Sequence, residues 1–381
     1  MTKNLPIEAT ANFENSVPFF WLLAPWAKFG EEAAETFQRN IDFAKEETKE
    51  EFELKPVWAT ANEIVYELNT MWLRDFSDAA ARGDSSIIPT LIDPPYAGHH
   101  STIADYAEGQ SLVETLQASG LRRLLCIDWK SASAEMKDYN IDIYLAEINA
   151  VVDDLGGRVN LIGLCQGGWM AAMFAARYPY KVATLTVAGA PLDCDAGDGF
   201  VKKIAKEQPM AFFEELVNAG GGRMRGKFML AGWKSMHPEE HYFKTHVDLY
   251  ENVEDPAFVK KREEFERWYE NPLDLPGRWY LQAIRLLFKD NAFFKGDFVA
   301  LGRKIALKDI ICPTFLLAGE GDDITPSPQV FSAEEKLGTP KDKIVKKLVP
   351  GGHIGLFMGS KTLKNFWPDI AAWIKRECPD A

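Results

Sequence analysis

The segment Gly-Leu-Cys-Gln-Gly-Gly at residues 163–168 constrains the fold of this chain most strongly. It ends an apolar run at 159–164, typical of a buried strand, and it opens a stretch at 167–178 whose apolar residues have helical spacing. So tight a strand-to-helix turn has no room for flanking side chains, and it forces its central residue into a strained backbone conformation above the sheet. The segment therefore predicts a nucleophile elbow with Cys165 as the nucleophile.

Apolar runs alternate with helical patterns on both sides of this turn. Strands are expected at 87–92, 121–128, 159–164, 181–188, 311–318 and 344–349, and helices at 103–119, 141–153, 167–178 and 366–375. Continuous apolar strands alternating with helices are typical of a mostly parallel sheet covered on both faces. Together with the elbow, this order predicts an α/β-hydrolase fold.

Four regions are expected along the chain. Residues 1–82 read as an N-terminal helical extension, with helices at 31–54 and 57–77. The hydrolase core is expected in two parts, and the helical, aromatic-rich block between them is interpreted as a cap or lid. These regions are 83–195 for the first part of the core, 196–300 for the cap and 301–381 for the second part.

Composition excludes several classes of protein. The 381 residues carry 43 basic and 56 acidic side chains, a net charge of −13, which is unfavourable for nonspecific binding of nucleic acid or an anionic membrane. The five cysteines include no CxxC pair, so free thiols in a reducing, cytoplasmic compartment are expected. An apolar run at 17–26 is shorter than the ~20 residues of a spanning helix, and it reads as a packing or subunit contact rather than a membrane or granule anchor.

A cysteine nucleophile needs a base, and the base needs an orienting acid. In this architecture the acid and the base follow late strands, in the chain order nucleophile, acid, base. His353 lies in a glycine-flanked loop after the strand at 344–349 and is the candidate base. The loop after the strand at 311–318 offers Asp322 or Asp323 as the acid, and spacing alone does not decide between them.

The oxyanion of the reaction needs backbone N–H donors. One is expected from Gln166, the residue after the nucleophile, and the second from Tyr96 or Ala97 in the loop after the first core strand. His99 and Trp169 are expected to contact the substrate, although a structural role is the alternative for a loop histidine.

No metal or cofactor is expected. His237, His241 and His246 have spacings that superficially suggest a metal site, but no HExxH is present and Pro238 interrupts the helix. The chain contains neither GxGxxG nor GxxxxGK[ST], so a dinucleotide or P-loop site is not supported. A coenzyme A thioester would be a substrate, not a cofactor.

Residues 159–179 (VNLIGLCQGGWMAAMFAARYP) resemble the lipase-like box of poly(3-hydroxyalkanoate) synthases, which have cysteine where lipases have serine. The similarity extends over residues 88–376 and includes LKDIICP at 307–313 and PGGHIGLFMG at 350–359. The resemblance implies a catalytic set of Cys165, Asp322 and His353, and on this ground Asp322 is preferred to Asp323.

The chain departs from the synthase pattern in two places. Synthases usually have Asp-His where this chain has Asp322-Asp323, and the Asp-Asp-Ile sequence and the YAGHHST loop at 96–102 look more like intracellular polyhydroxyalkanoate depolymerases. Residues 169–192 and 226–233 look most like a further synthetase-like family of unknown function.

The resemblance implies a cysteine acyltransferase that acts on 3-hydroxyacyl-coenzyme A thioesters through an acyl-cysteine intermediate. The first alternative is a depolymerase or other (thio)ester hydrolase that uses the same triad. The second is a non-catalytic protein that binds polyester granules or a synthase. The resemblance is also compatible with a homodimer.

Overall fold

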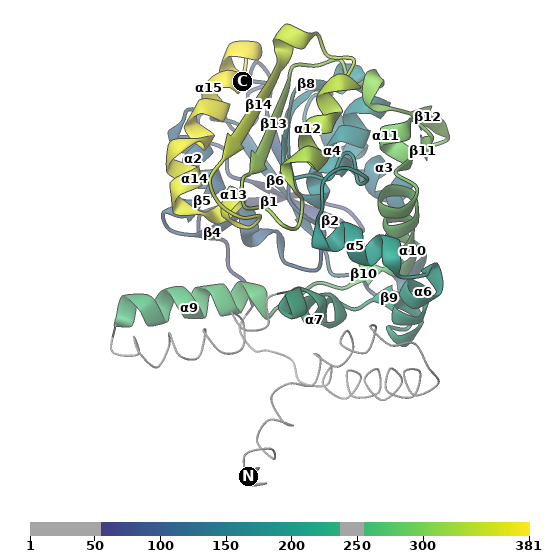
Figure 1. Cartoon of the computed structure of the whole chain (residues 1–381). Helices are drawn as coiled ribbons and strands as arrows, with labels where there is room; N and C mark the ends of the chain where they lie inside the picture. Colours follow the sequence, from purple (N-terminus) through teal and green to yellow (C-terminus); the bar gives the residue numbers. More distant parts are fainter. Residues whose placement is uncertain (1–54, 237–254) are drawn as a thin grey trace, which may run out of the picture.

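The computed structural model describes residues 55–236 and 255–381. Its centre is an eight-stranded sheet in the order β1-β2-β6-β3-β7-β8-β13-β14 (Figure 1). These strands span Glu63–Glu67, Met71–Asp75, Leu124–Trp129, Thr90–Asp93, Val159–Leu164, Val182–Ala188, Thr314–Gly319 and Ile344–Val349, in that order. Strand β2 is antiparallel to both its neighbours, and the other paired strands of this sheet are parallel. The predicted α/β-hydrolase fold is confirmed.

Helices cover both faces of the sheet (Figure 1). Helices α3 (Ile141–Asp154) and α4 (Gln166–Arg177) pack into one apolar core, and α2 (Leu112–Ala118), α14 (Ser360–Asn365) and α15 (Trp367–Glu377) pack into the other. The central strand β7 is buried along its whole length and contributes to both cores. This explains why β7 reads as an uninterrupted apolar run in the sequence.

The helix predicted at 57–77 is wrong, because this region forms strands β1 and β2. In β2 the buried Met71 and Leu73 alternate with the half-buried Trp72 and Arg74, which is a period of two. Pairing with β6 fixes the extended backbone of β2. The expected N-terminal helical extension over 1–82 is therefore wrong from residue 63 onward, and the helix predicted at 31–54 lies outside the described residues.

The helix predicted at 103–119 is right only in its second half. Residues 101–111 instead form a short 3-10 turn (Ser101–Ala104) and a hairpin of β4 (Asp105–Ala107) and β5 (Gln110–Ser111). Gly109, with a φ of 72°, turns the chain between the two strands, and the Ser111 side chain caps the start of α2.

We call residues 196–300, between β8 and β13, the cap segment. Its described helices are α5 (Phe200–Glu207), α6 (Met210–Ala219), α7 (Gly226–Met236), α9 (Pro256–Tyr269), α10 (Gly277–Gln282), a π-helix (Ala283–Lys289) and α11 (Ala292–Lys295). It also contributes the paired strands β9 (Arg223–Met224) and β10 (Leu275–Pro276), and it runs into β11 (Phe298–Ala300), which pairs with β12 (Arg303–Ile305). Helices α7 and α9 lie beneath the sheet in Figure 1.

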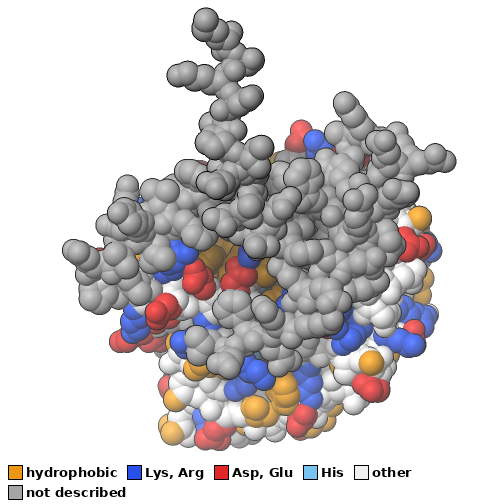
Figure 2. Space-filling view, turned by 90° about the horizontal axis from the view of Figure 1, so that it is seen from below, with side chains coloured by type: hydrophobic (Ala, Val, Ile, Leu, Met, Phe, Trp, Pro, Cys, Tyr) orange, Lys and Arg blue, Asp and Glu red, His pale blue; other side chains and the backbone are white. Residues whose placement is uncertain are grey.

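The cap segment is tied to the core through the loop after β3. The Leu273 N–H donates to the carbonyl of Gly98 (2.8 Å), and the Trp268 indole N–H donates to the carbonyl of His100 (3.0 Å). Seen from below in Figure 2, the described surface has basic and acidic side chains interspersed. No helix in the described part of the chain is both long enough and apolar enough to span a membrane.

Candidate active site

Cys165 occupies the turn between β7 and α4 in a backbone conformation that side chains rarely adopt, with φ 50° and ψ −116°. The neighbouring glycines make this turn possible. A Cβ at Gly163 would lie 2.5 Å from the Cα of Gly168, and a Cβ at Gly167 would lie 2.1 Å from the carbonyl oxygen of Asp93. The glycines thus allow β7, α4 and the loop after β3 to approach closely, and the turn has the conformation of a nucleophile elbow.

His353 and Asp322 lie in contact on the loops after β14 and β13. The His353 Nδ1 is 2.7 Å from Asp322 Oδ2, and both side chains are buried. The other carboxylate oxygen, Oδ1, accepts the N–H groups of Ile324 (3.1 Å) and Thr325 (2.8 Å). These bonds fix the carboxylate, and the carboxylate in turn fixes the imidazole ring with Nδ1 as its donor nitrogen.

The sheet brings these two loops together. Strands β13 and β14 pair in parallel over six residues, so their carboxyl ends leave the sheet at the same edge. Past the ends of these strands, the N–H of Glu320 donates to the carbonyl of Val349 (2.9 Å), and the N–H of Gly321 donates to the carbonyl of Gly351 (3.0 Å). The acid loop and the base loop are thus joined by backbone hydrogen bonds.

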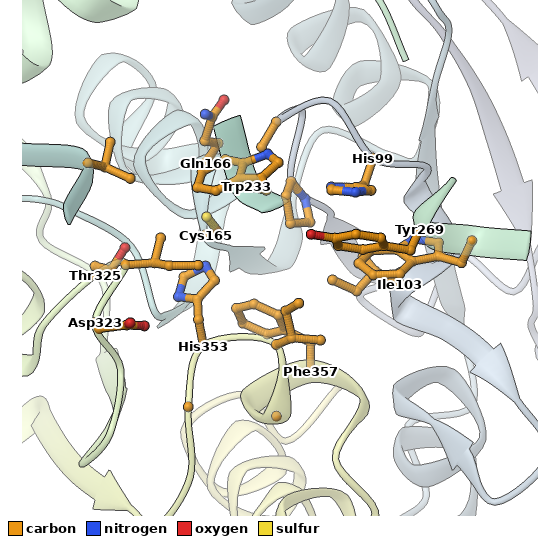
Figure 3. A pocket seen from close by; sticks show the side chains of 18 of the residues that line it. His99, Ile103, Cys165, Gln166, Trp233, Tyr269, Asp323, Thr325, His353 and Phe357 are labelled. Carbon is orange, nitrogen blue, oxygen red and sulfur yellow. The ribbon is translucent and has the colours of Figure 1, made fainter. Parts of the chain in front are cut away.

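Figure 3 shows the His353 ring directed at the Cys165 sulfur. Burial alone would lower the pKa of His353, but the charges of Cys165 and Asp322 and hydrogen bonds to both outweigh it and raise the pKa to about 10. The imidazolium form is therefore favoured at neutral pH. Such a site holds a proton next to the reacting sulfur atom.

A cavity of about 330 Å³ opens over these residues. The cavity is lined by Cys165, Gln166, His353 and Asp323. Asp322 therefore differs from its neighbour: Asp322 is hydrogen-bonded to His353, whereas Asp323 faces the cavity. The cap segment supplies the aromatic side chains Trp233, Phe265, Trp268 and Tyr269 to the lining. These residues were not expected in the site, because their spacing shows an apolar helix face but not what that face covers.

The neighbouring histidines His99 and His100 have different surroundings. The His99 ring stacks on Trp268 (centroids 4.7 Å apart) and Tyr269 (4.9 Å), and burial lowers its pKa to about 4. Its Nε2 is buried without a hydrogen-bond partner among the described residues. His100 instead accepts the Thr102 N–H (3.3 Å) and lies 3.9 Å from Asp128. Both histidines line the cavity, where His99 presents a neutral ring and His100 has the partners named above.

Trp169 does not reach the cavity, which corrects the expectation that it contacts substrate. Its ring is buried against Trp279, with centroids 5.6 Å apart, because residue 169 lies on the face of α4 that packs into the core. The Tyr96 side chain is also in the core, and its hydroxyl donates to the carbonyl of Lys130 (3.0 Å). Of the two candidate donors in this loop, Ala97 lines the cavity.

The four other cysteines are buried. Burial raises the pKa of the thiols of Cys126, Cys194, Cys312 and Cys378. Across residues 55–236 and 255–381, no group of three His, Cys, Asp or Glu side chains is arranged to hold a metal ion. His237, His241 and His246 lie outside the described residues.

The sheet order, the single antiparallel strand and the elbow define the class, which is that of α/β-hydrolase-fold enzymes. A solved structure of this class, the monoacylglycerol lipase of Paleococcus ferrophilus, superposes on 81% of this chain and 99% of its own with a TM-score of 0.50 and 14% sequence identity. At this identity the similarity concerns the fold.

Within that class the chain belongs to the family described as "Protein of unknown function (DUF3141)", whose profile matches residues 63–375. Similar curated proteins include the poly(3-hydroxyalkanoate) polymerase subunit PhaC of Haloferax mediterranei, 28% identical over 90% of this chain and 69% of that protein. The protein of the same name from Allochromatium vinosum is 27% identical over 76% of this chain and 79% of its own length.

Proposed function

We propose that this protein is a cysteine acyltransferase, similar to polyhydroxyalkanoate synthases, that takes 3-hydroxyacyl groups from coenzyme A thioesters. The observation that carries the proposal is the His353 ring, which is held by Asp322 on one nitrogen and directed at Cys165 on its other side. The similarity to proteins named poly(3-hydroxyalkanoate) polymerase subunit supports the choice of substrate.

In the proposed first half-reaction, the proton shared by Cys165 and His353 is held on His353, and the Cys165 thiolate attacks the carbonyl carbon of the thioester. The bond from carbon to the coenzyme A sulfur breaks, and the departing thiolate takes the proton from His353. A thioester replaces a thioester, so this step is close to neutral in free energy. A serine at position 165 would instead form an ester, from which onward transfer is less favourable.

In the second half-reaction, the hydroxyl at the end of a growing chain attacks the acyl-Cys165 carbonyl while His353 accepts its proton. An ester bond forms, and the proton returns to the Cys165 sulfur. The oxyanion of both steps is held by the backbone N–H of Gln166, which opens α4 and so has no partner inside the helix, and by that of Ala97.

The test is incubation of the purified chain with 3-hydroxybutyryl-coenzyme A, following free thiol and product together. Release of thiol with formation of insoluble polyester supports the proposal. Absence of thiol release, with the protein folded, would refute it. Cys165→Ala is the matched control and should release no thiol.

Hydrolysis is the second candidate function, because Asp323 lines the cavity beside the histidine. In the resemblance described above, an aspartate at this position is a feature of the depolymerases. Water would then replace the chain-end hydroxyl in the second half-reaction. The same assay distinguishes the two, since hydrolysis releases thiol and leaves soluble hydroxy acid without polymer. A protein that only binds granules would release no thiol at all.

A further inference from the structure

A second cavity, of about 140 Å³, adjoins the active-site cavity. The two share four lining residues, Gln166, Val201, Trp233 and Phe288. Gln166 follows the nucleophile directly in the chain, so the second cavity begins one residue from Cys165. A group attached to the Cys165 sulfur therefore has two spaces to occupy: the active-site cavity and this one behind Gln166.

The second cavity is lined by the cap segment and is apolar. Its walls come from α5, α6, α7 and the π-helix, with side chains such as Ile204, Phe212, Phe228 and Ile284. Among the described residues, three side chains with polar atoms line it, Gln166, Trp233 and Tyr280, and no charged side chain does. Burial raises the pKa of Tyr280, so its hydroxyl is neutral. Such walls exclude the phosphates and amides of coenzyme A and suit a hydrocarbon chain.

Two side chains with polar atoms, Gln166 and Trp233, lie at the boundary of the two cavities. There the side-chain oxygen of Gln166 and the indole N–H of Trp233 are buried without hydrogen-bond partners among the described residues. Buried polar atoms of this kind are normally satisfied, so the two atoms indicate where a polar group of the ligand lies. A 3-hydroxyacyl group carries its hydroxyl on the third carbon, counting the carbonyl carbon as the first. Beyond that carbon the group is hydrocarbon only.

We propose that the second cavity binds the alkyl substituent of a 3-hydroxyacyl group, with the hydroxyl at Gln166 and Trp233. The inference rests on the proposed function and gives it a preference for acyl groups longer than 3-hydroxybutyryl, which remains a substrate but has only a methyl group to place in the second cavity. Each methylene buried there is expected to improve binding about fourfold.

Gly232 provides the means to fill this cavity. It lies in α7, lines the second cavity, and a Cβ added to it would meet no atom within 4 Å. The substitution Gly232→Leu therefore adds an aliphatic side chain whose Cβ meets no atom, and it favours the helix. Gly232→Ala is the smaller member of the same series. Lys203→Leu adds a leucine to an exposed position of α5 that lines neither cavity and serves as the matched control.

The first measurement is of binding alone and does not depend on catalysis. In the Cys165→Ala background, the dissociation constants of 3-hydroxyoctanoyl- and 3-hydroxybutyryl-coenzyme A are measured by calorimetry. We expect the octanoyl compound to bind at least tenfold more tightly, and Gly232→Leu to remove most of that preference, Gly232→Ala less of it and Lys203→Leu none. Equal binding of the two compounds, or a preference unchanged by Gly232→Leu in a folded variant, would overturn the inference.

The second measurement is the rate of thiol release from the same two thioesters by the chain with Cys165 intact. We expect Gly232→Leu to lower the ratio of the octanoyl rate to the butyryl rate at least tenfold. If neither thioester releases thiol while the binding preference is present, the proposed function fails and the assignment of the cavity stands. If both react at a ratio that Gly232→Leu leaves unchanged, the cavity assignment fails and the proposed function stands.

Discussion

At the residue scale, what distinguishes Cys165 from the other cysteines is its neighbour. All five thiols are buried, and burial raises the pKa of the other four. Among the described residues, only Cys165 lies beside an imidazole held by a buried carboxylate, and it alone opens a long helix after a strained turn. This arrangement supplies the base and the orienting acid that a cysteine nucleophile needs.

Asp322 and Asp323 are predicted to differ in how much their substitution lowers turnover. Asp322→Asn keeps the shape of the side chain but removes the charge that orients and stabilises the His353 imidazolium, so turnover of an acyl thioester should fall by about 10²-fold or more. Asp323→Asn, the matched control, should change turnover by less than about tenfold because Asp322 still holds His353. A larger loss at Asp323 in steady-state assays would reverse the assignment of the acid.

The raised pKa of His353 makes the stability depend on pH. In the folded protein His353 keeps its proton up to a pH of about 10, whereas in the unfolded chain it loses it near 6.5. Between these values the folded state binds more protons at this site, so the contribution of His353 to the free energy of unfolding is fully present below pH 6.5 and falls as the pH rises, by about 1.4 kcal/mol per pH unit at most.

Urea unfolding at pH 6.5 and 8 measures this decline. In the His353→Gln variant the contribution of the imidazole is absent, so the decline should be smaller than in the wild-type protein. Parallel declines in the two proteins would show that the proton on His353 is not held in the folded state as described.

At the element scale, the elbow depends on glycine positions that no other residue can fill. A Cβ at Gly167 would overlap the carbonyl oxygen of Asp93, and backbone on both sides fixes this contact. We therefore expect Gly167→Ala to lower the free energy of unfolding by about 2 kcal/mol or more and to abolish turnover. Gly232→Ala, where the added Cβ meets no atom, should be neutral or stabilising by up to about 1 kcal/mol. Thermal unfolding of both variants checks this, and equal effects would contradict it.

The sequence predicted the bounds of two strands well. The bounds of β7 agree with the run at 159–164, and this buried strand is paired on both sides. The bounds of β14 agree with the run at 344–349, although this strand lies at an edge of the sheet and three of its six side chains are exposed. Strand β1 lies at the edge of the sheet, and its mostly exposed side chains carry no periodic signal that separates a strand from a helix. The β4–β5 hairpin was missed because its strands of three and two residues are shorter than any detectable pattern.

At the scale of the whole molecule, the site is assembled from segments far apart in the chain. Chain order and strand ends predicted Cys165, His353 and an acid at Asp322 or Asp323, because an α/β fold brings the carboxyl ends of its strands to one edge. The preference for Asp322 came from the resemblance to the synthases. The aromatic lining contributed by the cap segment could not be predicted, since it depends on how α7 and α9 dock over that edge. Trp169 was misplaced for the same reason, because the face of α4 that it occupies is covered by Trp279 of the cap segment.

The docking of the cap segment to the loop after β3 is predicted to matter for turnover. Trp268→Phe removes the hydrogen bond to the carbonyl of His100 and alters the stacking on His99, so kcat/KM for an acyl thioester should fall about tenfold and stability by about 1 kcal/mol. Trp373→Phe is the matched control: Trp373 is equally buried, its indole nitrogen has no partner among the described residues, and it packs against Phe315 in the core. Loss of activity in both variants, or in neither, would contradict a specific role for the docking.

The central claim is that the sulfur of Cys165 carries the acyl group. The most direct measurement is mass spectrometry of the protein quenched in acid shortly after mixing with 3-hydroxybutyryl-coenzyme A. The account predicts the mass of one or more 3-hydroxybutyryl units on the peptide that contains Cys165, and none on any peptide of the Cys165→Ala variant. Turnover without an adduct on that peptide, or turnover retained by Cys165→Ala, would contradict it.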